Sequence, residues 1–234
     1  LLLSADAVFA ALHLVHAYTP YLPSEYFSLG RDLGYGETFQ YVEEFWIIVM
    51  LGSLLARTRR AVYGAWGLLF VYLLLDDSLM FHETFGQAFA GLFGFGPLLG
   101  LRAKDLGEVA VSATAAALLG LVVGAAYFRG SRDDRSLARQ LALFVGLAAF
   151  FGVVFDMVNF VLARDSIAWH LSHLDIFEEG GEMVSMTLAC AFVYERHERR
   201  PARAVVEADL LPASGAPAGD PAPVAAAVLA PRAG

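Results

Sequence analysis

Six apolar stretches, each about as long as the hydrocarbon core of a bilayer is thick, constrain this chain more than any other feature. A helix of about 20 apolar residues crosses a core roughly 30 Å thick, and a helix satisfies its backbone hydrogen bonds within one segment. The stretches are Leu1–Tyr18, Phe39–Ala56, Ala61–Phe81, Leu106–Phe128, Gln140–Ala163 and Glu178–Tyr194. The sequence therefore predicts an all-α fold, a polytopic transmembrane helix bundle with six spans.

The composition excludes several other classes of protein. Only 17% of the 234 residues are charged, whereas a soluble domain carries about a quarter. The net charge of −8 excludes a nucleic-acid partner bound through a basic face. The single cysteine, Cys190, excludes an intramolecular disulfide and a zinc site built from cysteines. Membrane lipid is the partner that this composition predicts.

The basic residues predict the orientation of the spans. Twelve of the 16 fall on one side of the six-span arrangement: three after the second span, four after the fourth, and five after the sixth. Loops rich in arginine and lysine stay in the cytoplasm. We therefore expect both termini to be cytoplasmic, in a multi-pass protein of a bacterial inner (cytoplasmic) membrane.

The segments between and after the spans differ in character. The outer loops, at 19–38, 84–105 and 164–177, are long. Residues 84–101 suit an interfacial or shallow re-entrant segment, and 164–177 suit a short helix lying on the membrane. Residues 201–234 hold 12 Ala and six of the nine Pro. Because such a segment cannot build a packed core, we expect a helix bundle over 1–200 and a disordered cytoplasmic tail over 201–234.

Four carboxylates on four different spans reach a similar depth. Glu44, Asp76, Asp156 and Glu182 lie 13, 16, 17 and 14 residues from the nearest cytoplasmic arginine of their own span. At 1.5 Å per residue these separations correspond to roughly 20–25 Å. Four acids at one level, in the outer third of the bilayer, indicate a site.

These acids need a neutralising partner. A central carboxylate costs about 2.5–3.5 kcal/mol in a span, and no Lys or Arg lies within the spans to pair with it. The alternatives are a bound cation, protonated carboxyls that hydrogen-bond to one another, or a water-filled vestibule. Carboxylates mixed with imidazoles favour a divalent metal such as Zn, Mn or Fe. The predicted ligands are Glu44, Asp76, His82, Glu83, Asp156, His170, His173 and Glu182.

The inner halves of the spans lack ionisable side chains apart from tyrosines and Cys190. Small residues recur there, among them Gly120, Gly124, Gly146 and Gly152, and these predict close helix packing. A pathway across the membrane needs polar groups at both faces, so alternating-access transport is disfavoured.

Three classes of function remain. The first is a metal-dependent membrane enzyme, hydrolase-type, in which a metal-bound water attacks a lipid or a small periplasmic substrate. The second is a non-catalytic accessory or assembly subunit, whose acids face other membrane subunits. The third is a transporter or channel.

The asymmetry of the basic residues generates a labelling experiment. Cysteine introduced at Ser28 or Ser166 should react with an impermeant thiol reagent in intact cells, because both positions lie in predicted outer loops. Cysteine at Ser131 or Ala202 should be protected. Labelling at position 131 from outside would contradict the predicted orientation.

Overall fold

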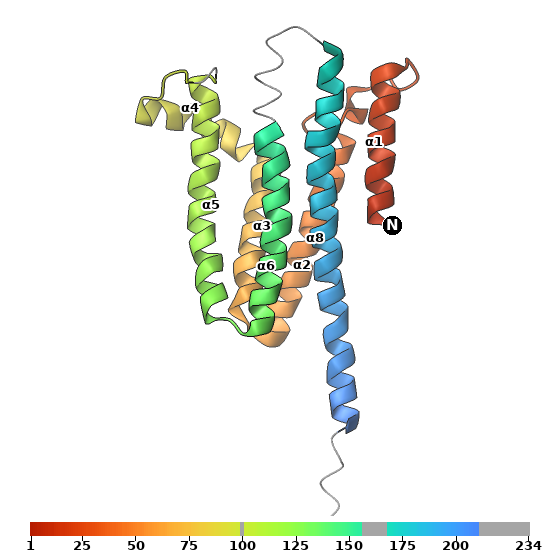
Figure 1. The fold of residues 1–234 in the computed structure, drawn as a ribbon, viewed down its shortest axis with the longest axis vertical. Coiled ribbons are helices and arrows are strands. Elements are labelled where there is room, and N and C mark those ends of the chain that lie inside the picture. The colour runs from red at the N-terminus through yellow and green to blue at the C-terminus, as the bar shows by residue number, and fades with distance from the viewer. Residues whose placement is uncertain (99–100, 156–167, 211–234) are drawn as a thin grey trace, which may run out of the picture. The chain divides into compact units, whose positions relative to one another are not determined.

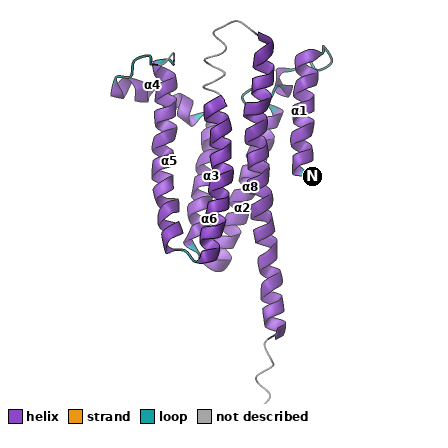
Figure 2. Cartoon of the chain, viewed as in Figure 1, coloured by secondary structure: helices purple, strands orange, loops and turns teal. Residues whose placement is uncertain are grey.

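The computed structural model describes residues 1–98, 101–155 and 168–210, and these residues form helices and connecting turns (Figures 1 and 2). Side chains of the last helix are described between Ile176 and Arg199. The helical elements are α1 (Leu2–Tyr18), η1 (Glu25–Phe27), α2 (Tyr35–Thr58), α3 (Ala61–Leu79), α4 (Phe81–Phe93), α5 (Ala103–Arg129), α6 (Arg132–Ala149), η2 (Phe150–Phe155) and α8 (Ala168–Leu210). Over these ranges the chain has no β-strand, which confirms the all-α class.

Four helices are long and apolar enough to cross a membrane: α2, α3, α5, and α6 continued by η2 to Phe155. They correspond to the second to fifth predicted spans. α1, with 17 residues, is a shorter apolar helix, and α8 carries three glutamates in the predicted sixth span. Six spans and their orientation therefore stay a prediction.

Two of the predicted outer segments contain regular helix. Within 84–105, residues up to Phe93 belong to α4, which begins at Phe81. Within 164–177, residues from Ala168 onward form the first turns of α8, continuous with the predicted sixth span. No Gly or Pro lies between Ala168 and Phe177, so nothing local ends the helix there.

The boundary at residue 200 and the disordered tail stay predictions, because residues 211–234 lie outside the described part of the chain. α8 runs on to Leu210, so this boundary falls inside a helix. The chain divides into two compact units, Leu1–Glu198 and Arg199–Gly234. The first unit holds the core and every site described below.

The apolar core lies where α2, α3, α6 and α8 meet (Figure 1). Each helix contributes side chains that are fully buried or nearly so. Ile47, Leu51 and Leu54 come from α2, Phe70 from α3, Leu137 and Leu141 from α6, and Val193 from α8. The α2 residues are spaced three and four apart, the spacing that keeps one helix face toward a core.

An ion pair connects the α2–α3 turn to the α5–α6 turn. Arg60 donates from Nη1 to Asp134 Oδ1 at 3.1 Å. Asp134 also accepts from the backbone N–H and the hydroxyl of Ser131, the residue that caps α6. Two turns that the sequence places on the same side of the membrane are therefore joined to each other.

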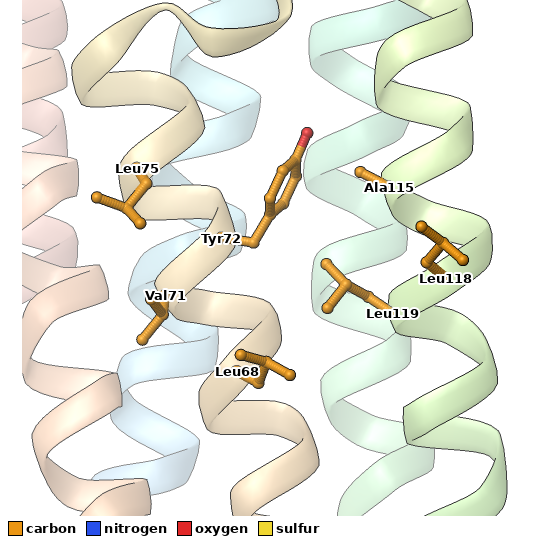
Figure 3. A pocket seen from close by; sticks show the side chains of 7 residues that line it. All are labelled: Leu68, Val71, Tyr72, Leu75, Ala115, Leu118 and Leu119. Carbon is orange, nitrogen blue, oxygen red and sulfur yellow. The ribbon is translucent and has the colours of Figure 1, made fainter.

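α5 approaches α4 closely but stands apart from α3. At the α4–α5 crossing, a Cβ on Gly107 would collide with the backbone carbonyl of Gly86. Farther along, a Cβ on Gly120 or Gly124 would meet nothing within 4 Å, and the same holds for Gly146 on α6. A cavity of about 380 Å³ separates α3 from α5 (Figure 3), lined by Leu68, Val71, Tyr72, Leu75, Ala115, Leu118 and Leu119.

The prediction of close packing at Gly120, Gly124 and Gly146 is therefore wrong. Small residues permit close approach but do not impose it. On the α3–α5 side, Leu118 and Leu119 of α5 line the cavity. Close contact is instead made at Gly86 and Gly107, where α4 packs against the first turns of α5.

The glycine crossing can be tested with two alanine variants of α5. Gly107→Ala should destabilise the protein by about 1–3 kcal/mol, because its methyl group must displace the α4 backbone. Gly120→Ala, on the same helix but facing open space, should leave stability unchanged or slightly raised. Thermal melting of both variants in one detergent measures the difference. Equal melting temperatures would contradict the close crossing.

Candidate functional site

The buried face of α2 changes character along its length. In the C-terminal half this face is Ile47, Met50, Leu51 and Leu54; in the N-terminal half it is Gly36, Gln40, Glu43 and Glu44. These positions lie on one broad face of the helix. They recur every three or four residues when the adjacent pairs Glu43–Glu44 and Met50–Leu51 are each counted as one step. The apolar half packs into the core, so the carboxylates of the other half are turned into the bundle with it.

Glu44 is the most deeply buried carboxylate on this face. Its side chain is 0% exposed, and neither carboxylate oxygen accepts a hydrogen bond from the residues that the structure describes. The polar groups that act on it are Asp77 of α3, Glu182 of α8 and the amide of Gln40. We call Glu44, Asp77 and Glu182 the acidic centre.

Asp77 enters the acidic centre from α3. The hydroxyl of Tyr41 donates to the Asp77 backbone carbonyl at 3.1 Å, which fixes the register of α2 against α3 at this level. The Asp77 carboxyl lies near enough to Glu44 for the two acidic groups to act on each other, although neither Glu44 oxygen makes a hydrogen bond within the described part of the chain. Because both groups are acceptors when ionised, a hydrogen bond between them requires a proton.

Glu182 enters the acidic centre from α8. A Cβ on Gly152 would collide with Glu182 Oε1, so the carboxylate lies directly against the backbone of η2. A larger residue at position 152 would require this carboxylate to move. Asp77, Glu178 and Glu37 are the acidic groups that act on Glu182, and Gln40 is a hydrogen-bond partner.

The acidic centre gathers negative charge in a place of low dielectric. The groups that act most strongly on Glu44 and Glu182 are all acidic or neutral. A buried charge with no partner is strongly unfavourable, and the amide of Gln40 can satisfy only part of three carboxyls. Such a centre can hold a cation or share protons.

Asp76 and His82 form a separate pair at the junction of α3 and α4. Asp76 Oδ1 accepts from the His82 backbone N–H at 2.9 Å, and Asp76 Oδ2 lies 3.2 Å from His82 Nδ1. The intervening Met80 has a φ of 49°, in the left-handed region, and this turn brings His82 back over Asp76. Hydrogen bonding to Asp76 raises the pKa of His82 above its ordinary value, and burial opposes this only in part.

The predicted ligands are thus divided among several places. Glu44 and Glu182 come together in the acidic centre, while Asp76 and His82 pair with each other and Glu83 lies 3.7 Å from Lys104. Asp156 and the side chains of His170 and His173 lie outside the described residues. Among the residues that are described, no group of three His, Cys, Asp or Glu side chains has the arrangement of a metal site.

Sequence reasoning missed two members of this site. Asp76 was among the predicted ligands and Asp77 was not, whereas Asp77 is the residue of α3 that acts on Glu44. The sequence reasoning did not consider Gln40, although Gln40 precedes Glu44 by one helical turn on the face that continues to Ile47 and Leu51. The spacing along α2 was the signal that could have identified Gln40.

Comparison with known proteins supplies a family and no chemistry. A family model described as "Domain of unknown function (DUF8692)" matches residues 1–195, the part of the chain that contains all six predicted spans. No curated protein and no solved structure matches the chain. A functional conclusion therefore depends on the geometry above.

The Asp76–His82 pair predicts a pH-dependent stability. His82→Gln removes the ring but keeps the backbone N–H that Asp76 accepts. Because the folded-state pKa of His82 is raised above 6.5, the contribution of the charged ring is fully present below pH 6.5 and is lost as the pH rises through the raised pKa. The variant should melt below the wild type at about pH 6 and approach it at about pH 9. A difference in melting temperature that is the same at both pH values would contradict a charged pair.

Proposed function

The chain belongs to the DUF8692 family, and we propose that it is a multi-pass inner-membrane protein whose acidic centre binds a divalent cation from the outer side. Glu44, Asp77 and Glu182 supply oxygen ligands from three helices. Zn, Mn and Fe are the metals that we propose, with Asp156, His170 and His173 as further ligands.

The burial of Glu44 carries this proposal. Each carboxylate deep in a membrane span costs about 2.5–3.5 kcal/mol, so three would cost on the order of 8–10 kcal/mol together. One neutral hydrogen bond contributes only about 0.5–1.5 kcal/mol. The amide of Gln40 therefore cannot offset the cost of burying three carboxylates. A bound cation offsets the cost, because it removes the repulsion and satisfies the free oxygens at once.

The position of Glu182 supports a metal in particular. Its carboxylate lies against Gly152, and Asp156 follows Gly152 by four residues in the sequence. Asp156 itself lies outside the described residues. We propose Asp156 as the ligand that completes the set from the α6 side.

A metal in this place would support hydrolysis. The metal would lower the pKa of a bound water and orient it toward a lipid or a small periplasmic substrate. A carboxylate not needed as a ligand would act as general base. The inner halves of the spans contain no ionisable side chains apart from tyrosines and Cys190, so this proposal favours chemistry at the outer side over transport.

Elemental analysis and melting curves test the proposal together. Detergent-purified protein should contain Zn, Mn or Fe, and EDTA should lower its melting temperature. A metal at 100 times its Kd stabilises the folded state by about 2.7 kcal/mol. Asp77→Asn and Glu182→Gln, which keep shape and remove charge, should reduce the response to EDTA. Glu25→Gln, at a side chain 75% exposed, is the matched control and should respond as the wild type does.

The rival arrangement gives the opposite result. If Glu44 and Asp77 share a proton instead, the protein contains no metal and its melting temperature does not change in EDTA. Asp77→Asn is then as stable as the wild type or more stable, because the amide supplies the missing donor. That outcome excludes the hydrolase and favours an accessory subunit of a larger membrane complex.

A further inference from the structure

Glu43 and Glu44 are neighbours in the sequence but face different helices. Successive residues of an α-helix point about 100° apart, so Glu44 is directed to Asp77 of α3 while Glu43 is directed to α8 and α1. Glu43 is 1% exposed, and its Oε1 accepts a hydrogen bond of 2.6 Å from the hydroxyl of Thr187 on α8. The other oxygen, Oε2, has no hydrogen-bond partner among the described residues.

Asp6 of α1 adds a second carboxylate to the same place. It is 6% exposed, although it belongs to a helix whose side chains are mostly exposed or half-buried. Neither of its oxygens accepts a hydrogen bond within the described part of the chain. The polar groups around it are Thr187 and Glu43, but Thr187 has one hydroxyl hydrogen and gives it to Glu43.

Three buried carboxylate oxygens are therefore left without a donor. They are both oxygens of Asp6 and Oε2 of Glu43. The groups that act on Asp6 and Glu43 include no Lys, Arg or His, and the two carboxylates repel each other. One shared proton would leave one negative charge buried and two protons would leave none, whereas a divalent cation cancels both charges while the carboxylates stay ionised.

We propose that Asp6, Glu43 and Thr187 form a second cation site, which takes a hard divalent cation of the Mg²⁺ class. The ligand set consists only of oxygens, which suits Mg²⁺ and disfavours Zn²⁺ or copper. Mg²⁺ is bound through one or two carboxylates and keeps several waters.

The site does not depend on the acidic centre, and it has a structural consequence of its own. Its ligands come from α1, α2 and α8, so the ion joins α1 to the bundle. Other polar contacts of α1 lie near its other end, where His13 Nδ1 accepts from the Leu29 backbone N–H at 2.9 Å and His16 Nδ1 lies 2.7 Å from the Leu22 carbonyl oxygen. Loss of the ion would leave two like charges facing each other across the α1–α2 contact.

Magnesium titration of the full chain in detergent tests the proposal. Protein stripped with EDTA and returned to chelator-free buffer should show a melting temperature that rises with added MgCl₂ and saturates. Asp6→Asn and Glu43→Gln should each abolish this rise. Glu44→Gln should retain it, which separates this site from the acidic centre and makes the outcome independent of the proposed function.

A pair of Thr187 variants keeps both carboxylates and guards against variants that fail to fold. Thr187→Val removes the ligand oxygen and should weaken the apparent Mg²⁺ affinity about tenfold or more, as lost metal contacts do. Thr187→Ser keeps the hydroxyl and should bind as the wild type does.

Two results would overturn the proposal. One is a melting temperature that does not respond to MgCl₂, or a response that survives in Asp6→Asn. The other is an infrared band from a protonated carboxyl that is present in the wild type and absent in both Asp6→Asn and Glu43→Gln. That band would assign the position to a shared proton and not to a metal ion.

Discussion

The rest of this structure depends on which face of α2 is turned toward the core. Ile47, Leu51 and Leu54 are all 0% exposed, and they fix which face of the helix meets α3, α6 and α8. A helix is stiff over this length, so its N-terminal half cannot turn independently. The apolar half thus holds Glu43 and Glu44 inside the bundle, where their own preference would be for water.

The same logic explains why the fold was more predictable than the site. Span lengths follow from hydrophobicity, because any sufficiently long apolar helix is stable in lipid. The second to fifth predicted spans correspond to α2, α3, α5 and α6 continued by η2. A site requires the rotation of each helix as well. Counting depth from the arginines could rank Asp76 and Asp77 as nearly equal, but only packing decides that Asp77 meets Glu44 while Asp76 turns to His82.

The sequence could not predict which glycines are required by contacts between distant segments. Gly107 needs to be glycine because of the Gly86 backbone, and a Cβ at Gly152 would require the Glu182 carboxylate to shift. Neither requirement is written in the local spacing. Glycines that are prominent in the sequence, such as Gly120 and Gly124, have no close neighbour among the described residues. A small residue therefore permits close helix packing, and the position of the neighbouring helix determines whether that packing occurs.

The distribution of polarity along α2 also connects the two proposed sites. Glu43 and Glu44 are consecutive residues of one rigid helix, so a shift of α2 that opened one site would move the other. Their charges act in the same low-dielectric region, and a cation at one site lowers the negative potential felt at the next. Through the position of α2, cation binding at one site would thus favour binding at the other. Through charge, it would weaken binding at the other. The balance depends on the apolar contacts of Ile47, Leu51 and Leu54, since a firmly packed α2 suppresses the mechanical coupling and leaves the electrostatic one.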